Sequence, residues 1–284
     1  MSQYNIGNIE ILKVAESVGP TSPKFLFETA SYQDIEKHHD WLKPHFVDET
    51  GKLIMSIHSY IIKTRQHTII VDTCIGNDKQ GRHYPPWNNL KGPYLQDLAK
   101  AGVPPESVDF VFCTHLHVDH VGWNTRLENG RWVPTFPNAK YLFNKVEYEH
   151  WEKSREPAEK AVFDDSVLPI MNARQAQLVG ADFQIDDGLV LESTPGHTPG
   201  HCSLDIASSG QKGVITGDMF HHPVQIAENA YSSAFDVDKP LAIETRRKFC
   251  EKYTDRDVRI LGTHFAPPSA GRIVERKGQW RLSV

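Results

Sequence analysis

Residues 108–120 read Val-Asp-Phe-Val-Phe-Cys-Thr-His-Leu-His-Val-Asp-His and predict a buried strand that runs directly into a metal site. The apolar run at 108–114 is typical of a buried β-strand. Four potential ligands follow it: His115, His117, Asp119 and His120. Imidazole nitrogen and carboxylate oxygen suit Zn²⁺ and related divalent ions. Three solvated histidines would be hard to explain directly after a buried strand, so we interpret the cluster as a metal site.

Further metal ligands are expected downstream, because one short segment cannot complete a site. Residues 193–201 read Ser-Thr-Pro-Gly-His-Thr-Pro-Gly-His, and their prolines and glycines predict a tight loop that presents His197 at a fixed angle. Two later strand-like runs end in Asp218 and in His264. We interpret His201, the second histidine of the loop, as structural.

Strand-like and helical segments are mixed along the chain. Strands are predicted at residues 9–14, 56–62, 67–72, 108–114, 189–192, 202–206, 214–216 and 258–261. Helices are predicted at residues 94–101, 144–155, 172–179 and 238–253. This mixture favours sheets covered by helices over an all-β barrel. No linker or low-complexity tract interrupts residues 1–284, so we expect a single domain.

The two halves of the chain share a layout. In the first half a strand ends in Asp72, and 43 positions later another ends in His115. In the second half a strand ends in Asp218, and 46 positions later another ends in His264. This layout would bring four polar side chains to one edge of the fold, although chance similarity of buried strands is an alternative.

Composition excludes several classes of function. The formal charge of -5 is mild and both signs are scattered, which argues against nucleic-acid binding and gives no electrostatic reason for membrane binding. The first residues lack the pattern of a secretory signal, and no apolar run approaches the length of a membrane span. The four cysteines lack a CxxC spacing. We therefore expect a cytoplasmic protein with reduced thiols and no nucleic-acid or membrane partner.

The motif order His-x-His-x-Asp-His, Thr-Pro-Gly-His-Thr-Pro-Gly-His, Gly-Asp and a strand-ending His resembles the metallo-β-lactamase superfamily, over about residues 56–265. The resemblance implies an α/β fold, the αββα sandwich of two mixed β-sheets flanked by helices, with metals at one edge. It also implies two divalent metal ions as cofactors, with Zn²⁺ favoured over Mn, Fe or Co.

The same resemblance assigns roles to individual residues. Seven ligands are implied: His115, His117 and His197 for the first metal, Asp119, His120 and His264 for the second, and Asp218 as the bridge between them. Asp72 matches a family acid that supports the ligating histidines without binding metal. Such an acceptor fixes which imidazole nitrogen carries the proton.

Within the superfamily, residues 217–225 (Gly-Asp-Met-Phe-His-His-Pro-Val-Gln) look most like the dinuclear hydrolase branch of N-acyl-homoserine lactonases and methyl-parathion-type hydrolases. The resemblance implies an enzyme that cleaves a small lactone or related carboxylic ester with a metal-bridging hydroxide. Asp119 or Asp218 would then relay a proton to the leaving group.

Other functions share parts of this pattern. A phosphotriester or aryl-ester hydrolase would use the same metals, so only the shape of the substrate pocket would distinguish such an enzyme from a lactonase. A thioester hydrolase of the glyoxalase II type is less favoured, because the segment after His264 is short for a glutathione-binding helical domain. The full ligand set and the lack of a flavin domain disfavour an iron redox enzyme and a non-catalytic binding protein. The sequence names neither the substrate nor the native metal.

Substrate-pocket residues are harder to identify. Residues 76–94 are predicted to form either a lid that offers Tyr84, Trp87 and Tyr94 to a substrate or a well-packed surface loop. Tyr231 is a candidate to hydrogen-bond the substrate. His221 and His222 are candidates to line the pocket, although we favour a structural role for each. Residues 1–50 are interpreted as an N-terminal extension whose aromatic part is a candidate contact for a homodimer.

Overall fold

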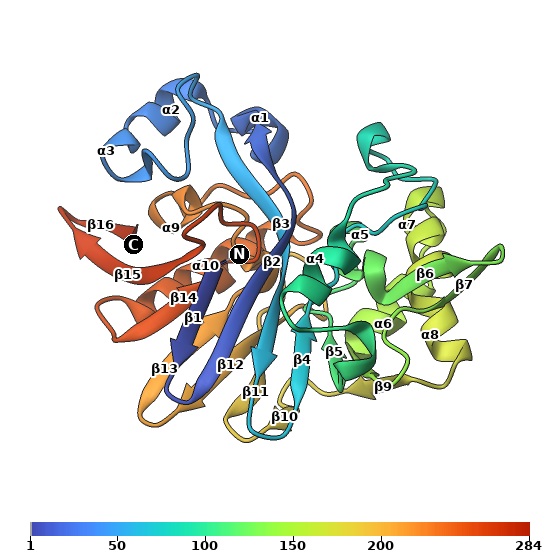
Figure 1. The fold of residues 1–284 in the computed structure, drawn as a ribbon. Coiled ribbons are helices and arrows are strands. Elements are labelled where there is room, and N and C mark those ends of the chain that lie inside the picture. Colours follow the sequence, from blue (N-terminus) through green and yellow to red (C-terminus); the bar gives the residue numbers. More distant parts are fainter. Residues whose placement is uncertain (1) are drawn as a thin grey trace. The chain divides into compact units, whose positions relative to one another are not determined.

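Short runs rich in Val, Ile and Phe form strands along this chain, because β-branched and aromatic side chains pack well on a pleated surface. In the computed structural model, which describes residues 2–284, these strands form two seven-stranded mixed sheets flanked by helices (Figure 1). The predicted fold class is confirmed.

The chain divides into two units. Unit 1 comprises residues 2–16 and 57–183, and unit 2 comprises residues 17–56 and 184–284. Apart from the ends of two long strands, each unit holds one of the two large sheets. The expected single domain over residues 1–284 stays a prediction.

Unit 1 carries the sheet with strand order β1-β2-β3-β4-β5-β8-β9. Its strands are β1 (Ser2–Ile6), β2 (Ile9–Thr21), β3 (Leu53–Lys63), β4 (Thr68–Val71), β5 (Phe110–Phe112), β8 (Lys140–Asn144) and β9 (Ala176–Val179), with a separate hairpin of β6 (Thr125–Glu128) and β7 (Arg131–Pro134). Its helices are α4 (Tyr94–Lys100), α5 (Val118–Val121), α6 (Lys145–Glu152), α7 (Pro157–Val162) and α8 (Leu168–Asn172), with a π-helical turn at Phe163–Val167 and 3₁₀ turns at Pro85–Trp87, Pro105–Ser107 and Gly122–Asn124.

Unit 2 carries the sheet with strand order β10-β11-β12-β13-β14-β15-β16. Its strands are β10 (Gln184–Asp186), β11 (Leu189–Ser193), β12 (Cys202–Ser208), β13 (Gln211–Ile215), β14 (Val258–Leu261), β15 (Ala270–Arg276) and β16 (Gln279–Ser283). Its helices are α1 (Pro23–Leu26), α2 (Tyr32–Glu36), α3 (His39–Leu42), α9 (Val224–Ala227) and α10 (Lys239–Tyr253), with a 3₁₀ turn at Gly217–Met219.

Each unit contains a parallel strand pair that explains the shared layout of the two halves. In unit 1, β4 and β5 are parallel, with Val71 opposite Phe112. In unit 2, β13 and β14 are parallel, with Ile215 opposite Leu261. Parallel neighbours end at the same edge of their sheet, so the polar residues that follow the two strands of each pair are brought together. The acid and the histidine of each half are therefore neighbours within their unit.

The helix predicted at residues 172–179 is wrong. Helix α8 ends at Asn172, and residues 176–179 form strand β9, which pairs in parallel with β8. Between them Arg174 has a φ of 57°, in the left-handed region that interrupts a right-handed helix. The short stretch Ala-Gln-Leu-Val then pairs with β8 at the edge of the sheet.

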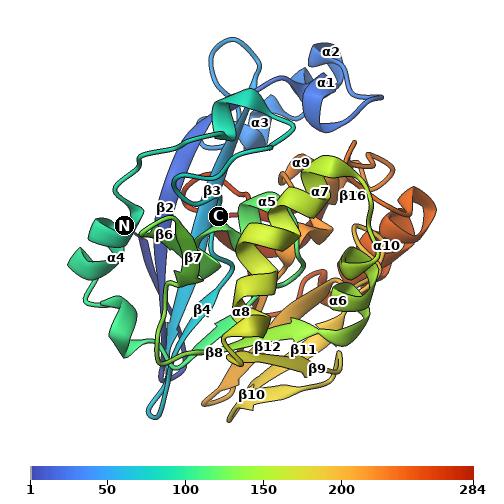
Figure 2. The ribbon, with the colours of Figure 1, turned by 90° about the vertical axis from the view of Figure 1, so that its right-hand side faces the viewer.

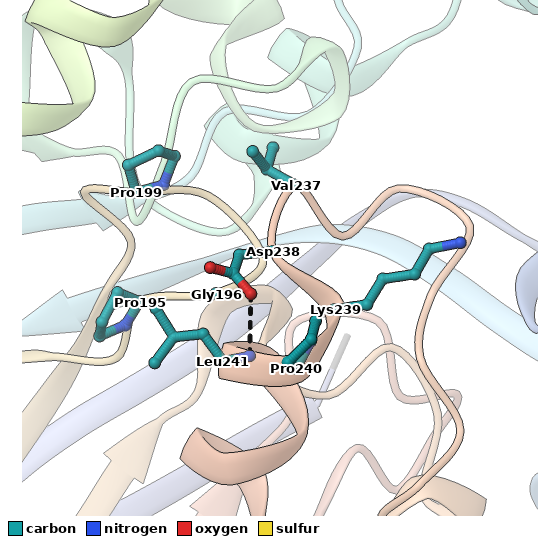
Figure 3. Close-up of a pocket in the computed structure, with 8 residues that line it drawn as sticks. All are labelled: Pro195, Gly196, Pro199, Val237, Asp238, Lys239, Pro240 and Leu241. Carbon is teal, nitrogen blue, oxygen red and sulfur yellow. Dashed lines mark hydrogen bonds between the residues drawn. The ribbon is translucent and has the colours of Figure 1, made fainter.

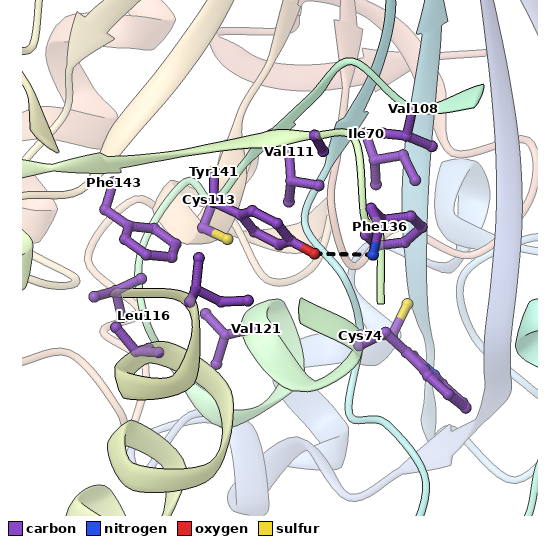
Figure 4. Packing of buried hydrophobic residues seen from close by; sticks show 14 of the residues in the cluster. Ile70, Cys74, Val108, Val111, Cys113, Leu116, Val121, Phe136, Tyr141 and Phe143 are labelled. Carbon is purple, nitrogen blue, oxygen red and sulfur yellow. Dashed lines mark hydrogen bonds between the residues drawn. The ribbon is translucent and has the colours of Figure 1, made fainter. Parts of the chain in front are cut away.

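The core of unit 1 is built from strand residues and from the inner faces of the helices. Tyr141 and Phe143 of β8 pack with Val111, Cys113 and Phe136 (Figure 4). The buried Tyr141 hydroxyl accepts a hydrogen bond from Phe136 N (3.1 Å) and donates one to the carbonyl oxygen of Asn124 (3.0 Å). Helix α6 lies beside β8 and β9 (Figure 2) and adds its buried aromatic side chains to this core.

The core of unit 2 includes the segment that was interpreted as an N-terminal extension. Leu26, Phe27, Leu42 and Phe46 are buried with side chains of β13, β14 and α10. An ion pair of 2.6 Å between Asp40 and Arg281 joins α3 to β16, which lie close together in Figure 1. Residues 22–50 therefore complete the core of their own unit, and their contact with a second subunit stays a prediction.

Two further findings concern the described chain as a whole. Its four cysteines are buried thiols and form no disulfide within residues 2–284. None of the helices in residues 2–284 combines the length and the apolar character that a membrane span requires.

Gly122 lies where two backbone segments of unit 1 approach closely. Its N–H donates to the carbonyl oxygen of Cys74 (2.8 Å), and a Cβ at this position would lie 1.8 Å from the carbonyl oxygen of Ile75. This approach fixes the turn that carries the histidine cluster against the end of β4.

We expect Gly122→Ala to lower the free energy of unfolding by at least about 3 kcal/mol, because the clash is with backbone that cannot move aside. Urea unfolding monitored by tryptophan fluorescence measures the change. Gly130→Ala is the matched control, since its Cβ would meet nothing within 4 Å, although its φ of 75° costs some strain. Equal losses for the two variants would contradict the close-packing argument.

Candidate metal centre

Unit 1 gathers potential ligands at the ends of β4 and β5. The segment after β5 turns into the short helix α5, which begins just after His117. Along this turn lie His115, His117, Asp119 and His120. His115 and His120 are fully buried, whereas His117 and Asp119 are partly exposed. The predicted cluster is therefore a set of neighbouring side chains on one turn.

Asp72 holds this turn from the end of β4. Its Oδ1 accepts the Thr114 N–H (2.8 Å), and its Oδ2 accepts the Thr114 hydroxyl (2.9 Å). The same Oδ2 lies 2.9 Å from His120 Nδ1. A carboxylate only accepts, so Nδ1 of His120 carries the proton and Nε2 presents its lone pair. That Nε2 lies 3.6 Å from Asp119 Oδ1.

His115 is oriented by the same network. Its Nδ1 lies 3.0 Å from the Thr114 hydroxyl oxygen, whose own proton is donated to Asp72. Nδ1 of His115 is therefore the donor, and its Nε2 faces Nδ1 of His117 at 3.0 Å. Glu147 of α6 supports the turn, because its carboxylate accepts the Leu116 N–H at 3.1 Å. The ring of His117 packs against Trp151, with centroids 5.1 Å apart.

In unit 2, three imidazoles surround one carboxylate oxygen. Oδ2 of Asp218 lies 3.1 Å from His264 Nε2, 3.4 Å from His221 Nε2 and 3.6 Å from His197 Nε2. All four side chains are buried. Asp218 follows β13 and His264 follows β14, so the parallel pair brings them together, while His197 comes from the Pro-Gly loop after β11.

The protonation of these imidazoles shows what the arrangement can hold. Nδ1 of His264 lies 3.0 Å from the Ser56 carbonyl oxygen, and Nδ1 of His197 lies 2.9 Å from Asp236 Oδ1. Both partners only accept, so each Nδ1 carries a proton. Each Nε2 faces Asp218, and there a neutral ring offers a lone pair. Lone pairs that converge on a carboxylate in a buried site require a cation or a proton between them. The donor set fits a divalent metal ion of the kind that binds imidazole and carboxylate.

His201 positions the backbone of Asp218. Its Nε2 accepts the Asp218 N–H (2.9 Å), so its Nδ1 carries the proton, which faces the Thr194 side-chain oxygen (2.8 Å) and carbonyl oxygen (3.0 Å). Both ring nitrogens therefore contact protein groups, in agreement with a structural role.

The two adjacent histidines after Asp218 differ in their surroundings. Nε2 of His222 lies 2.8 Å from the Phe46 carbonyl oxygen, and its Nδ1 accepts the Val224 N–H. Burial lowers the pKa of His222 to about 4. His221 instead stacks on His264, with centroids 5.8 Å apart, and burial lowers its pKa to about 3. These contacts favour a structural role for His222 and place His221 among the groups around Asp218.

Tyr231 is half-buried in unit 2. Its ring stacks on Phe27 at 5.7 Å, and burial raises its pKa to about 12. The substrate contact suggested for Tyr231 stays a prediction.

The loop at residues 76–94 combines exposed and buried aromatic residues. Tyr84 is exposed and packs edge-on against Trp87, with centroids 5.4 Å apart. Tyr94, in contrast, is buried at the start of α4, where its hydroxyl lies 2.5 Å from Ser59 Oγ. The suggestion that Tyr94 faces a substrate from the loop is therefore wrong, because its ring belongs to the core of unit 1.

A buried charge network anchors the first part of this loop. Lys79 is fully buried, donates to Thr125 Oγ1 (2.6 Å) and lies 3.7 Å above the ring of Trp132. Asp165, on the π-helical turn, pairs with Arg82 at 2.9 Å and lies 3.4 Å from Lys79. Burial lowers the pKa of Lys79 to about 7. One carboxylate thus serves two buried cations at the base of the loop.

Some supporting residues carry no signal in the sequence. Asp236 contacts His197, and Arg246 contacts Asp236 within unit 2, yet both residues lie outside every motif. Glu147 lies on a helix whose charged residues are otherwise typical of a solvated face. In the folded chain Glu147 differs from the exposed charged residues of α6, because it is buried and accepts hydrogen bonds from Leu116 N and Trp151 Nε1.

The chain is similar to known metal-dependent hydrolases. The family model described as the metallo-beta-lactamase superfamily matches residues 55–264. An N-acyl homoserine lactonase of Bacillus sp is 27% identical over 212 residues, which cover 70% of this chain and 78% of that protein. A lactonase of Agrobacterium fabrum, AttM, is 29% identical over 167 residues, which cover 56% of this chain and 60% of that protein.

Two solved structures share the fold. The hydrolase AbOPH has a TM-score of 0.80 at 24% identity and covers 100% of this chain and 97% of its own. The dizinc quorum-quenching lactonase AidC, in complex with a product, N-hexnoyl-L-homoserine, has a TM-score of 0.80 at 19% identity. The match covers 99% of this chain and 96% of the AidC chain.

The buried network of Asp165, Lys79 and Arg82 allows a test of whether one carboxylate balances both cations. We expect Asp165→Asn to lower the free energy of unfolding by about 3 kcal/mol, because two buried cations lose their counter-charge. Adding Lys79→Met should recover part of the loss, since one of those cations is then gone. Urea unfolding of both single variants and the double variant measures this coupling. Strictly additive losses would contradict a shared counter-charge.

Proposed function

The chain belongs to the metallo-beta-lactamase superfamily and is a hydrolase of that superfamily, and on this premise we propose that it cleaves a lactone or a related carboxylic ester with the help of two divalent metal ions. The observation that carries the proposal is the convergence of the Nε2 atoms of His264 and His197 on the Asp218 carboxylate in unit 2.

The proposed ligands are the seven residues that the motifs predict. They are His115, His117, Asp119 and His120 in unit 1, and His197, Asp218 and His264 in unit 2. The hydrogen bonds place a proton on Nδ1 of His120, His197 and His264. In each of these histidines Nε2 is therefore the proposed ligand atom. We favour Zn²⁺, because these ligands are nitrogen and carboxylate oxygen and because the structural neighbour AidC is a dizinc enzyme.

When bound, two divalent ions lower the pKa of water and polarise the carbonyl oxygen of an ester. The chain's own groups then hold the reactants and move protons. A carboxylate oxygen of Asp119 or Asp218 takes up a proton from the attacking water and returns it to the leaving oxygen. Asp72, Asp236 and the Ser56 carbonyl keep the ligating imidazoles in one protonation state throughout.

Substrate recognition is proposed for groups near these ligands and on the loop. His221 contacts the Asp218 carboxylate and is the histidine of its pair that we propose to face the substrate. Tyr84 and Trp87 on the loop tip, and Tyr231, are further proposed contacts. The lactone class is supported by the similarity to N-acyl homoserine lactonases over 70% of the chain.

A substrate panel tests the class of reaction. We expect metal-dependent hydrolysis of an N-acyl-homoserine lactone, with lower kcat/KM for an aryl ester, a phosphotriester and a thioester. Protein stripped with a chelator should lose the activity and regain it when Zn²⁺ is restored. A phosphotriester or a thioester cleaved faster than the lactone would refute the substrate class. Turnover that survives chelation would refute the metal requirement.

Asp218→Asn tests the central carboxylate. The amide removes the charge on which three imidazoles converge, so we expect metal content to fall and kcat to drop by more than about 100-fold, beyond the usual loss for a supporting residue. Elemental analysis and kinetics on one sample measure both. Asp34→Asn is the matched control, because this unit 2 carboxylate caps α2 and contacts none of the proposed ligands. Full turnover with two bound metals in the Asp218 variant would contradict the assignment.

A further inference from the structure

The geometry points to Asp236 as a positioning residue that acts through His197 and is itself held by the buried Arg246. This inference rests on the proposed function in one respect, the assignment of His197 as a metal ligand. Neither Asp236 nor Arg246 belongs to the motifs that identify the family in this sequence.

Asp236 accepts hydrogen bonds at both of its carboxylate oxygens. Its Oδ1 accepts the proton on His197 Nδ1 at 2.9 Å. Its Oδ2 accepts from Ser232 Oγ (2.8 Å), Ser233 N (2.9 Å) and Arg246 Nη1 (3.3 Å). The side chain of Asp236 has no exposed surface, so each of these bonds replaces a bond to water. The carboxylate therefore has a single orientation, and it transmits that orientation to the imidazole.

Arg246 supplies the charge that balances Asp236. Its side chain, on α10, has no exposed surface. Besides the ion pair, its guanidinium donates to the carbonyl oxygens of Met219 (3.5 Å) and Asn229 (3.4 Å). Met219 directly follows Asp218, so the guanidinium is tied to the central carboxylate segment as well as to Asp236. Burying a guanidinium is costly unless it is paired, and Asp236 is that pair.

The chain around Asp236 also fixes the backbone of the His197 loop. Val237 N donates to the His197 carbonyl oxygen, and Asp238 N donates to that of Gly196, each at 2.9 Å. Gly196 has a φ of 129°, and a Cβ there would lie 2.3 Å from Ala242 N, so the loop is pressed onto the start of α10. Figure 3 shows Gly196 beside Asp238, whose carboxylate caps α10 through Leu241 N. One segment therefore holds both the main chain and the ring of His197.

This support differs from that of the neighbouring His264. The proton on His264 Nδ1 goes to a backbone carbonyl, whereas that on His197 goes to a carboxylate. A carboxylate makes the opposite ring nitrogen more basic and hence a stronger ligand, and losing such a partner costs about 10- to 100-fold in metal affinity. Asp236 thus makes His197 a stronger ligand than its geometry alone would give.

The test measures zinc affinity by competition with a chromophoric chelator. Asp236→Asn keeps the shape and the acceptor at Oδ1 but removes the charge, so we expect affinity to fall by about 10-fold. Ser232→Ala removes one donor to Oδ2 and should lower affinity less, in the same direction. Asp34→Asn is the control, because it is the same substitution at a carboxylate of unit 2 that caps α2 and lies outside the segment that holds His197. We expect its affinity to equal that of the unmodified protein.

A second readout needs no metal. Long-range ¹H–¹⁵N NMR of the metal-free protein reports which nitrogen of His197 carries the proton, with the signal assigned by its loss in His197→Gln. We expect Nδ1–H in the unmodified protein and a shifted resonance in Asp236→Asn. If Asp236→Asn does not fold, Ser232→Ala and the NMR of the unmodified protein decide.

Three results would overturn the inference: unchanged affinity in both Asp236→Asn and Ser232→Ala, an equal loss in Asp34→Asn, or a His197 ring that carries its proton on Nε2 and none on Nδ1. An unmodified protein that binds no zinc would instead remove the proposed function. The NMR result would then still decide whether Asp236 orients His197.

Discussion

A neutral imidazole that offers one nitrogen to a metal carries a proton on the other, and in a buried site an acceptor for that proton fixes the tautomer. In this protein that acceptor is a carboxylate for His120 and His197 and a backbone carbonyl for His264. The acceptors in turn are held by buried groups at the ends of strands or beside α10. The fold therefore fixes which ring nitrogen carries the proton in each of these histidines.

Much of this arrangement was predictable from the sequence, for physical reasons. The apolar run before His115 and the strand before Asp218 are read from local composition, and the parallel pairing of strands then brings their ends together. The fold class followed from the motif order and the mixture of strands and helices. The proline and glycine residues around His197 likewise predicted a tight loop, because their backbone preferences are local properties.

Other features depend on contacts that no local pattern encodes. Asp236 lies in an ordinary polar stretch, and only the packing of α10 brings Arg246 to it. His221 and His222 are adjacent in sequence, yet one faces Asp218 and the other contacts Phe46, because the chain turns between them. Strand β9 was predicted as helix, since its four residues carry no periodicity and the sheet edge decides their conformation.

The hydrogen bonds to Asp72, Asp236 and Ser56 each orient an imidazole of the same unit, and this has a consequence for the energetics of cofactor uptake. Asp72 serves histidines of its own unit, and Asp236 and Ser56 serve those of theirs. These protein groups give each imidazole a defined tautomer, so part of the entropy of ordering these side chains is lost when the chain folds. Ion capture would then carry little reorganisation energy, which is the thermodynamic meaning of a preorganised site.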